Sequence, residues 1–342
     1  MIPRNSGLPC AAVAEDLVAK PLFGISIPQR GALFGVAPIR ELLGLARLAD
    51  ANPLFDSAWV GDSLTAKPRP ESLTLLGALA GMTERLKLGV GCMASFPVRD
   101  PVTFAYQWAT LDQVSGGRMR LAACTGLVKA ELASEAEGGH WGVPDKQRAS
   151  RLEENVRICR ALWGEDNASY QGKWRSFSNL TIDPKPVQQP CPIWITANPQ
   201  PGPYFDVGLR RAATMGDGWM TVRLFPGTFG AMWGRLQGFL REEGRDPETF
   251  PNIAYHNINI GPDKQACLEE SKRFLDNYYG PVFSPPMVAA WTAAGTPDEC
   301  VEHLDELARS GAKQITLRVT GWDQFGQYER MVNEVLPRVT GE

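Results

Sequence analysis

Short apolar runs rich in β-branched residues recur eight times along the chain, and most are followed by a segment with helical periodicity. The runs are continuously apolar, which is typical of parallel strands that are covered on both faces. Eight strand–helix units without a long linker predict a single (β/α)8 barrel, the TIM barrel, spanning residues 1–342. The predicted strands cover residues 22–28, 56–62, 86–94, 118–126, 192–198, 218–223, 252–260 and 314–320.

Helix-boundary signals between these runs support the alternation of strands and helices. Asp100 is a suitable N-cap residue because Pro101 follows it at the first helical position, and Gly116 lies where that helix is expected to stop. Thr296 opens another predicted helix, and Gly311 closes it. These signals place helices in the connections between strands, as a barrel requires.

Two connections are about twice as long as one strand–helix unit, and we interpret them as insertions. The first covers about residues 127–190, with a helix predicted over 146–162 and a hairpin near 170–177. The second covers about residues 277–296 and combines aromatic residues with several prolines. Both begin after a strand ends, on the barrel face that carries active sites, so we predict that they cover the site as lids.

Charge and composition argue against several classes of function. The chain has 342 residues, of which 44% are hydrophobic, and a formal net charge of −3. It lacks the basic stripe expected of a nucleic-acid-binding protein and the apolar run of about 18 residues expected of a membrane-spanning helix. We therefore expect neither nucleic acid nor membrane as a partner.

Cysteine and histidine usage also constrains the chemistry. The seven cysteines are scattered, odd in number and without a CxxC pair, which fits a reducing cytoplasm better than a disulfide framework. The N-terminal segment makes a poor signal peptide, so we expect a cytoplasmic protein. Only three histidines occur and none forms an HExxH motif, so we expect no metal site.

The second predicted strand ends with a carboxylate and a hydroxyl, Asp62 and Ser63. In a (β/α)8 barrel, the carboxyl ends of the strands present the catalytic groups. Asp62 is therefore a candidate site residue, although an aspartate at this place can equally cap the turn that follows. The local sequence leaves both interpretations open.

Several motifs, taken in order, resemble the bacterial luciferase-like flavin oxidoreductases. Each motif alone is weak, but their order and spacing are specific and extend over roughly residues 20–338. The resemblance implies a (β/α)8 barrel of the luciferase-like type with a flavin or deazaflavin ring lying across the carboxyl ends of the strands. The motifs are FDSAWVGDS, LTLLGALAGMTERLKLGVG, DPVTFAYQWATLDQVSGGRMRLAACTG, PIWITA, RRAATMGDGW and GTPDECVEHLDELARSGAKQITLRV.

The resemblance assigns roles to particular residues. Asp62 and Ser63 match the pair that approaches the ring or substrate, and they are the predicted catalytic residues. Strand three in the family often carries a bulge with a non-proline cis peptide under the ring, which corresponds to Gly91 and Cys92. The cofactor phosphate usually lies near the loop after strand five. The predicted cofactor-binding residues are Gly91, Cys92, Met93, Ala94, Thr125, Gly126, Thr196, Ala197, Asn198, Gly202 and Arg223.

The sequence departs from one branch of the family. Deazaflavin-dependent sugar-phosphate dehydrogenases carry a histidine at the position of Ser63 and a glutamate directly after the Thr-Gly that ends strand four. Here that position is Leu127, so both proton-transfer groups of those dehydrogenases are missing. This argues against a sugar-phosphate dehydrogenase.

Other residues allow two interpretations. Arg148 and Arg151 match a helix from which the family often places an arginine near the cofactor, but a solvated helix face is an equal alternative. His256 lies within a predicted strand, where a hydrogen-bonded core role is the more frequent one. Aromatic residues of the insertions, including Tyr279 and Trp291, suggest an apolar roof that excludes water.

From these observations we predict a flavin-dependent oxidoreductase. The main prediction is a two-component monooxygenase that uses reduced FMN and O2 on a small organic substrate, with FMN supplied by a separate flavin reductase. One alternative is a deazaflavin-dependent reductase or dehydrogenase, and another is a flavin-binding protein without turnover. The family resemblance and the apolar segment 71–82 further predict a homodimer.

Overall fold

A closed barrel of parallel strands forms the centre of the molecule. The computed structural model describes residues 20–126, 135–199, 204–222 and 226–341. Within them, eight strands pair in chain order, and the eighth pairs back to the first, so all eight predicted strands and the (β/α)8 architecture are confirmed. The strands are β1 (Leu22–Ile27), β2 (Phe55–Val60), β3 (Lys87–Met93), β4 (Met119–Ala123), β7 (Ile193–Thr196), β8 (Trp219–Val222), β9 (Asn252–Ile260) and β11 (Gln314–Val319).

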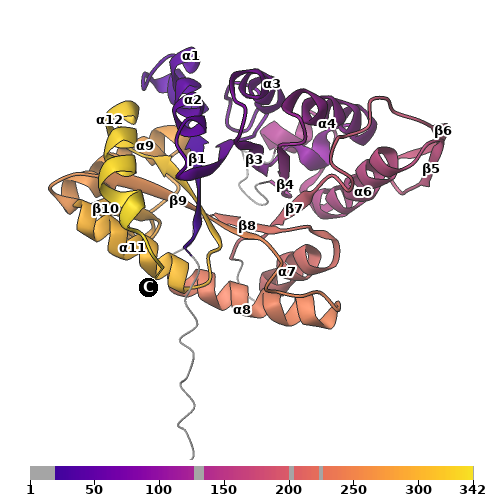
Figure 1. Cartoon of the computed structure of the whole chain (residues 1–342). Helices are drawn as coiled ribbons and strands as arrows, with labels where there is room; N and C mark the ends of the chain where they lie inside the picture. The colour runs from indigo at the N-terminus through magenta and orange to yellow at the C-terminus, as the bar shows by residue number, and fades with distance from the viewer. Residues whose placement is uncertain (1–19, 127–134, 200–203, 223–225, 342) are drawn as a thin grey trace, which may run out of the picture.

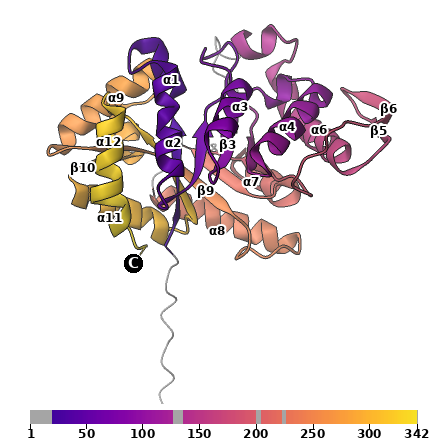
Figure 2. The same ribbon diagram turned by 45° about the horizontal axis from the view of Figure 1, so that its top comes forward.

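Helices surround the barrel and cover the outer face of its strands, as Figures 1 and 2 show from two directions. Both views place the last α-helix, α12, beside α1 and α2. Tyr328 of α12 stacks on Phe55 of β2 at a distance of 5.7 Å between ring centres. The helices of this layer are α1 (Ile39–Leu42), α2 (Gly44–Asp50), α3 (Ser72–Met82), α4 (Pro101–Ser115), α6 (Asp145–Gly164), α7 (Tyr204–Met215), α8 (Pro226–Glu242), α9 (Lys264–Tyr279), α11 (Pro297–Arg309) and α12 (Gln324–Arg330). Shorter helical segments are η1 (Gln29–Phe34), η2 (Phe96–Val98), η4 (Met331–Val335) and η5 (Leu336–Arg338).

The predicted helix boundaries agree with the structure. Asp100 caps α4 by accepting a hydrogen bond from the Thr103 amide, and Gly116 ends the helix in the left-handed conformation with φ of 68°. The α11 helix begins with a reciprocal capping box between Thr296 and Glu299. Local capping chemistry therefore determines where these helices begin and end.

Large side chains fill the lower part of the barrel interior. Trp59, Trp194 and Met220 form a buried cluster inside the sheet. Gly89 makes room for this cluster, because a Cβ atom at this position would lie 2.3 Å from the Trp59 ring. The packed lower interior leaves space only at the carboxyl ends of the strands.

The two predicted insertions fold into defined elements. The connection between β4 and β7 contains the π-helical segment η3 (Glu135–Gly139), α6 and the antiparallel pair β5 (Ala168–Gln171) and β6 (Ser176–Leu180), which confirms the predicted hairpin. The second insertion contains the end of α9, α10 (Pro285–Ala290) and β10 (Thr292–Gly295). β10 was not predicted; it extends the sheet as a ninth strand by pairing with β9. Among the described residues, no helix is long and apolar enough to span a membrane.

Candidate functional site

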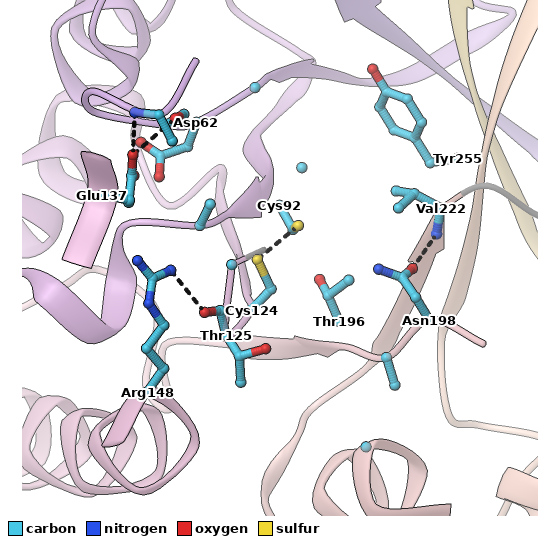
Figure 3. A pocket seen from close by; sticks show the side chains of 18 of the residues that line it. Asp62, Cys92, Cys124, Thr125, Glu137, Arg148, Thr196, Asn198, Val222 and Tyr255 are labelled. Carbon is cyan, nitrogen blue, oxygen red and sulfur yellow. Dashed lines mark hydrogen bonds between the residues drawn. The ribbon is translucent and has the colours of Figure 1, made fainter. Parts of the chain in front are cut away.

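A cavity of about 1000 Å³ opens at the carboxyl ends of the barrel strands. Its walls come from the residues that directly follow β2, β3, β4 and β7, and from both insertions. Figure 3 shows side chains from these segments converging on one space. This is the face on which (β/α)8 barrels carry their chemistry.

Ten of the thirteen predicted site residues line this cavity. Met93 does not, because its side chain is fully buried in the hydrophobic core, and successive residues of a strand point to opposite faces. Gly202 and Arg223 lie outside the described residues. The ten lining residues are Asp62, Ser63, Gly91, Cys92, Ala94, Thr125, Gly126, Thr196, Ala197 and Asn198.

Asp62 is buried at the cavity edge, and protein groups occupy both of its carboxylate oxygens. Oδ1 accepts from the Ser72 hydroxyl at 2.8 Å, and Oδ2 accepts from the Ser95 amide at 2.7 Å. Arg99 lies 3.5 Å from Oδ1. These contacts tie the loop after β2 to the loop after β3, so the geometry favours a positioning role for Asp62, and its predicted catalytic role stays a prediction.

Ser63 is held by a buried glutamate from the first insertion. Its hydroxyl donates to Glu137 Oε2 at 3.0 Å and accepts from the Lys67 amide at 3.0 Å. The same carboxylate accepts hydrogen bonds from three backbone amides, those of residues 64, 65 and 66. Glu137 therefore fixes the loop after β2 against η3.

The structure contains the strand-three feature that the family resemblance implied. The peptide between Gly91 and Cys92 is cis, and the register of β3 against β4 shifts between Gly91 and Met93. A Cβ atom on Gly91 would lie 3.2 Å from Met220 and from Trp59, so the barrel packing also favours glycine there. Cys92 and Ala94 face the cavity, and together with Gly126 they give it a floor of small side chains.

Arg148 extends from α6 into the cavity and is only 1% exposed. Nη1 donates to the Thr125 carbonyl at 3.2 Å, and Nε lies 3.4 Å from Asp145. Gly126, with φ of 75°, is required beside it, because a Cβ atom there would lie 2.3 Å from Nη1. The cavity role of Arg148 is thus the correct one of the two interpretations, whereas Arg151 stacks on Trp174 outside the cavity.

Apart from the Arg148 Nε–Asp145 ion pair, two buried polar atoms at the cavity have no hydrogen-bond partner among the described residues. They are Nη2 of Arg148 and Oγ1 of Thr196. Buried polar groups are almost always satisfied in folded proteins. A bound ring with acceptor oxygens at its edges, such as a flavin or deazaflavin, would satisfy both atoms. The residues present therefore fit the cofactor class that the resemblance implied.

Aromatic residues from β9 and the second insertion cover the other side of the cavity. Tyr255, Tyr279, Phe283 and Trp291 line it and contact one another. Burial raises the pKa of Tyr255 well above its ordinary value, and its hydroxyl lies 2.6 Å from Ser26 Oγ. This wall is apolar, and the Tyr255 phenol within it stays protonated at neutral pH.

A fully buried arginine holds this aromatic wall in place. Nε and Nη2 of Arg318 in β11 donate to Asn257 Oδ1 at 3.1 and 2.7 Å, and Nη1 donates to Tyr279 at 2.6 Å. The guanidinium lies within 5.4 Å of the ring centres of Tyr255, Tyr278, Tyr279 and Trp291. Arg318 is therefore already hydrogen-bonded to protein groups and enclosed by aromatic rings.

Sequence reasoning missed Glu137 and Arg318. The only charged residue within the predicted strand 314–320 was the available signal for Arg318. Glu137 carried no local signal. His256 hydrogen-bonds to His303 at 2.7 Å and does not line the cavity, which supports the core interpretation. Among the described residues, no group of three histidine, cysteine, aspartate or glutamate side chains is arranged to hold a metal ion.

A family model for luciferase-like monooxygenases matches residues 22–314, nearly the whole barrel. The chain belongs to the luciferase-like monooxygenase family. The predicted family and fold class are confirmed, and the protein is a luciferase-like oxidoreductase.

Curated relatives of this luciferase-like protein carry the name F420-dependent glucose-6-phosphate dehydrogenase. The protein of Rhodococcus erythropolis is 26% identical over 339 residues, covering 88% of this chain and 94% of that protein. The protein of Intrasporangium calvum is also 26% identical, covering 84% of this chain and 91% of that protein. These relatives are enzymes that depend on a deazaflavin.

Solved structures share the fold. An F420-dependent secondary alcohol dehydrogenase, solved with an F420–acetone adduct, has a TM-score of 0.79 at 18% identity and covers 94% of this chain and 99% of its own. A monooxygenase from Streptomyces bottropensis has a TM-score of 0.74 at 20% identity and covers 92% of this chain and 98% of its own. One fold thus carries both hydride-transfer and oxygen-dependent enzymes, and the fold alone does not choose between them.

Proposed function

We propose that this protein is a deazaflavin-dependent oxidoreductase that uses coenzyme F420 and acts on a small organic substrate. The observation that carries the proposal is the pair of unsatisfied polar atoms, Arg148 Nη2 and Thr196 Oγ1, beside a floor of small residues. The names of the curated relatives favour F420 over FMN. The main prediction from sequence was FMN, so the proposal adopts the alternative.

The residues of the floor and of α6 would hold the cofactor. When bound, the deazaflavin supplies two-electron chemistry by accepting or donating a hydride. The small side chains of Gly91, Cys92 and Ala94 allow a planar ring to approach the strand. Arg148 would pair with negative charge on the cofactor, because its guanidinium is buried and keeps a free donor. Thr196 would donate a second hydrogen bond.

The substrate side of the cavity favours an uncharged molecule with an apolar face. Its wall consists of Tyr255, Tyr279, Phe283, Met287 and Trp291. Arg318 lies behind this wall, enclosed by rings and hydrogen-bonded to Asn257 and Tyr279, and it does not line the cavity. Two other cations, Lys67 and Arg69, do line the cavity and lie over the rings of Tyr279 and Tyr278. We propose a secondary alcohol or ketone as the substrate class.

Two further features argue against a sugar phosphate despite the names of the relatives. The Ser63 hydroxyl is occupied by Glu137 and by the Lys67 amide. The two proton-transfer groups of the sugar-phosphate dehydrogenases, a histidine and a glutamate, are replaced by Ser63 and Leu127. A sugar phosphate would therefore lack the two side chains that transfer protons in those dehydrogenases.

The FMN-dependent monooxygenase remains a second candidate because the aromatic cover would exclude water from a reduced flavin. It would require a separate flavin reductase, as predicted from the sequence. The arrangement of Tyr279, Phe283 and Trp291 suits either cofactor, so a direct comparison of activities is needed.

Turnover measurements distinguish these candidates. The purified protein is mixed anaerobically with oxidised F420 and a panel of secondary alcohols, with glucose 6-phosphate included, and the loss of F420 absorbance is followed. In parallel, oxygen uptake is measured with chemically reduced FMN and the corresponding ketones. We expect alcohol-dependent reduction of F420 and no reaction with glucose 6-phosphate. Substrate-dependent oxygen uptake with reduced FMN, without F420 reduction, would overturn the proposal in favour of a monooxygenase.

A further inference from the structure

Two cysteines face each other on the cavity floor. Cys92 lies in the bulge of β3, and Cys124 directly follows β4, the neighbouring parallel strand. Their sulfur atoms are 2.9 Å apart, and both residues line the cavity, as Figure 3 shows. We propose that Cys92 and Cys124 form a redox modification site, in which a hydroperoxide that enters the cavity converts the two thiols into a reversible disulfide.

The two sulfur atoms already lie close to bonding distance. Cys92 is the bulge residue of β3 between Gly91 and Met93, and Cys124 follows Ala123, the register partner of Met93, so the two thiols come from adjacent strands. A disulfide bond is about 2.0 Å long, so the sulfur atoms must approach by about 0.9 Å. Small side-chain rotations can supply this movement without separating β3 from β4.

The environments of the two thiols assign them different roles. Cys92 is partly exposed to the cavity, whereas Cys124 is buried beneath it. The hydrogen bond with Cys92, together with burial, raises the pKa of the Cys124 thiol well above its usual range. Cys124 therefore keeps its proton at neutral pH and accepts the hydrogen bond that Cys92 donates across the 2.9 Å between the two sulfur atoms. Cys92 is the thiol that meets the oxidant.

The reaction balances with hydrogen peroxide as the oxidant. The Cys92 sulfur attacks one peroxide oxygen, the O–O bond breaks, and Cys92 becomes a sulfenic acid with release of one water. The Cys124 sulfur then attacks the Cys92 sulfur, the S–O bond breaks, and a second water leaves. Two thiols and one peroxide give one disulfide and two waters. An external dithiol reverses the step by thiol–disulfide exchange.

The other described cysteines provide controls. Cys159, Cys191, Cys267 and Cys300 are buried, and none of them lines the cavity. Burial raises the pKa of Cys159 well above its usual range. A peroxide that acts through the cavity should therefore leave Cys159 as a free thiol.

Peptide mapping of the cofactor-free protein tests the proposal. The protein is treated with a small excess of hydrogen peroxide, the remaining thiols are blocked with N-ethylmaleimide after unfolding, and the protein is digested with trypsin. Cys92 and Cys124 fall in separate single-cysteine peptides, 88–99 and 121–129. We expect a cross-linked pair of these peptides that disappears with dithiothreitol. The variants Cys92→Ser and Cys124→Ala should lose it, and Cys159→Ser should retain it.

Either of two results in the wild-type protein would overturn the proposal. One is complete blocking of both peptides by N-ethylmaleimide after peroxide treatment. The other is conversion of Cys92 to a sulfinic acid while Cys124 is still alkylated. Because the mapping needs neither cofactor nor turnover, its failure is distinguishable from failure of the proposed deazaflavin function.

Discussion

At the residue scale, the site is built from polar side chains that carry several hydrogen bonds each. Asp62 was predicted from its place at the end of a strand, and the structure places it at the cavity edge. Its partners Ser72 and Ser95 are 10 and 33 residues away in the chain. Glu137 is 74 residues from Ser63. Sequence patterns identify a strand end, but they do not show which distant donors will saturate a carboxylate.

We predict that Asp62→Asn lowers stability more than it changes cofactor affinity. Donors face both carboxylate oxygens, so the amide group of asparagine would meet a donor instead of an acceptor. The expected loss in unfolding free energy is about 1 to 3 kcal/mol, measured by urea denaturation. The control Asp56→Asn, which breaks a half-exposed ion pair with Lys87, should cost under about 1 kcal/mol. Normal stability with abolished turnover would instead support direct catalysis by Asp62.

At the element scale, local signals predicted the regular barrel and the two insertions that cover it, but not every element within those insertions. The apolar runs gave all eight barrel strands, and the caps Asp100 and Thr296 gave the starts of α4 and α11. The strand β10 has the sequence TAAG, which has little intrinsic strand preference and forms only because the edge of β9 is available. That the second insertion, about residues 277–296, opens and closes over the site as a lid stays a prediction.

We predict that Arg318→Met loosens this cover without unfolding the barrel. The variant removes the donors to Asn257 and Tyr279 and so detaches the aromatic wall from β11. Hydrogen exchange of residues 278–295 should become faster, while exchange in β1 to β4 stays unchanged. The control Arg273→Met replaces an exposed arginine on α9 and should leave both regions as they are. Unchanged protection of the cover in Arg318→Met would refute this role.

At the scale of the whole molecule, the histidine pair should make stability depend on pH. Burial lowers the pKa of His303 to about 4 and that of His256 well below its usual value, with Lys264 also lowering the former. In the unfolded chain the histidine side chains bind protons below about pH 6.5, whereas in the folded chain His303 does not bind one until about pH 4. Stability is therefore complete above about pH 6.5 and falls as the pH drops towards 4.

This dependence is measurable by calorimetry at pH 7.5 and pH 5. The lowered pKa of His303 alone should make the free energy of unfolding about 1 to 2 kcal/mol smaller at pH 5 than at pH 7.5. His303→Gln should show a smaller drop in Tm between the two pH values than the wild type, and the exposed His140→Gln should match the wild type. An equal drop in Tm between pH 7.5 and pH 5 in all three proteins would show that the histidine pair does not cause the pH dependence of stability.

The homodimer also belongs to this scale and stays a prediction. The structure weakens one of its supports, because the leucines of α3 are buried within the protomer. The exposed positions of this helix are Thr74, Ala78 and Gly81, which are small and would permit close approach of a second copy. Light scattering should give twice the chain mass of 37.5 kDa, and Ala78→Glu should reduce it to one chain. A monomer mass for the wild type at micromolar concentration would contradict the prediction.

The central claim is that the cavity binds an anionic deazaflavin through Arg148, and equilibrium binding tests it most directly. F420 and FMN are titrated separately into the wild type, Arg148→Met and Arg151→Met, the last being a matched change on the same helix outside the cavity. We predict tighter binding of F420 than of FMN. Arg148→Met should weaken F420 binding at least 10-fold, as expected for loss of a charged hydrogen bond of about 1.5 to 3 kcal/mol, and Arg151→Met should bind like the wild type. Tighter binding of FMN, or unchanged F420 affinity in a folded Arg148→Met protein, would contradict the claim.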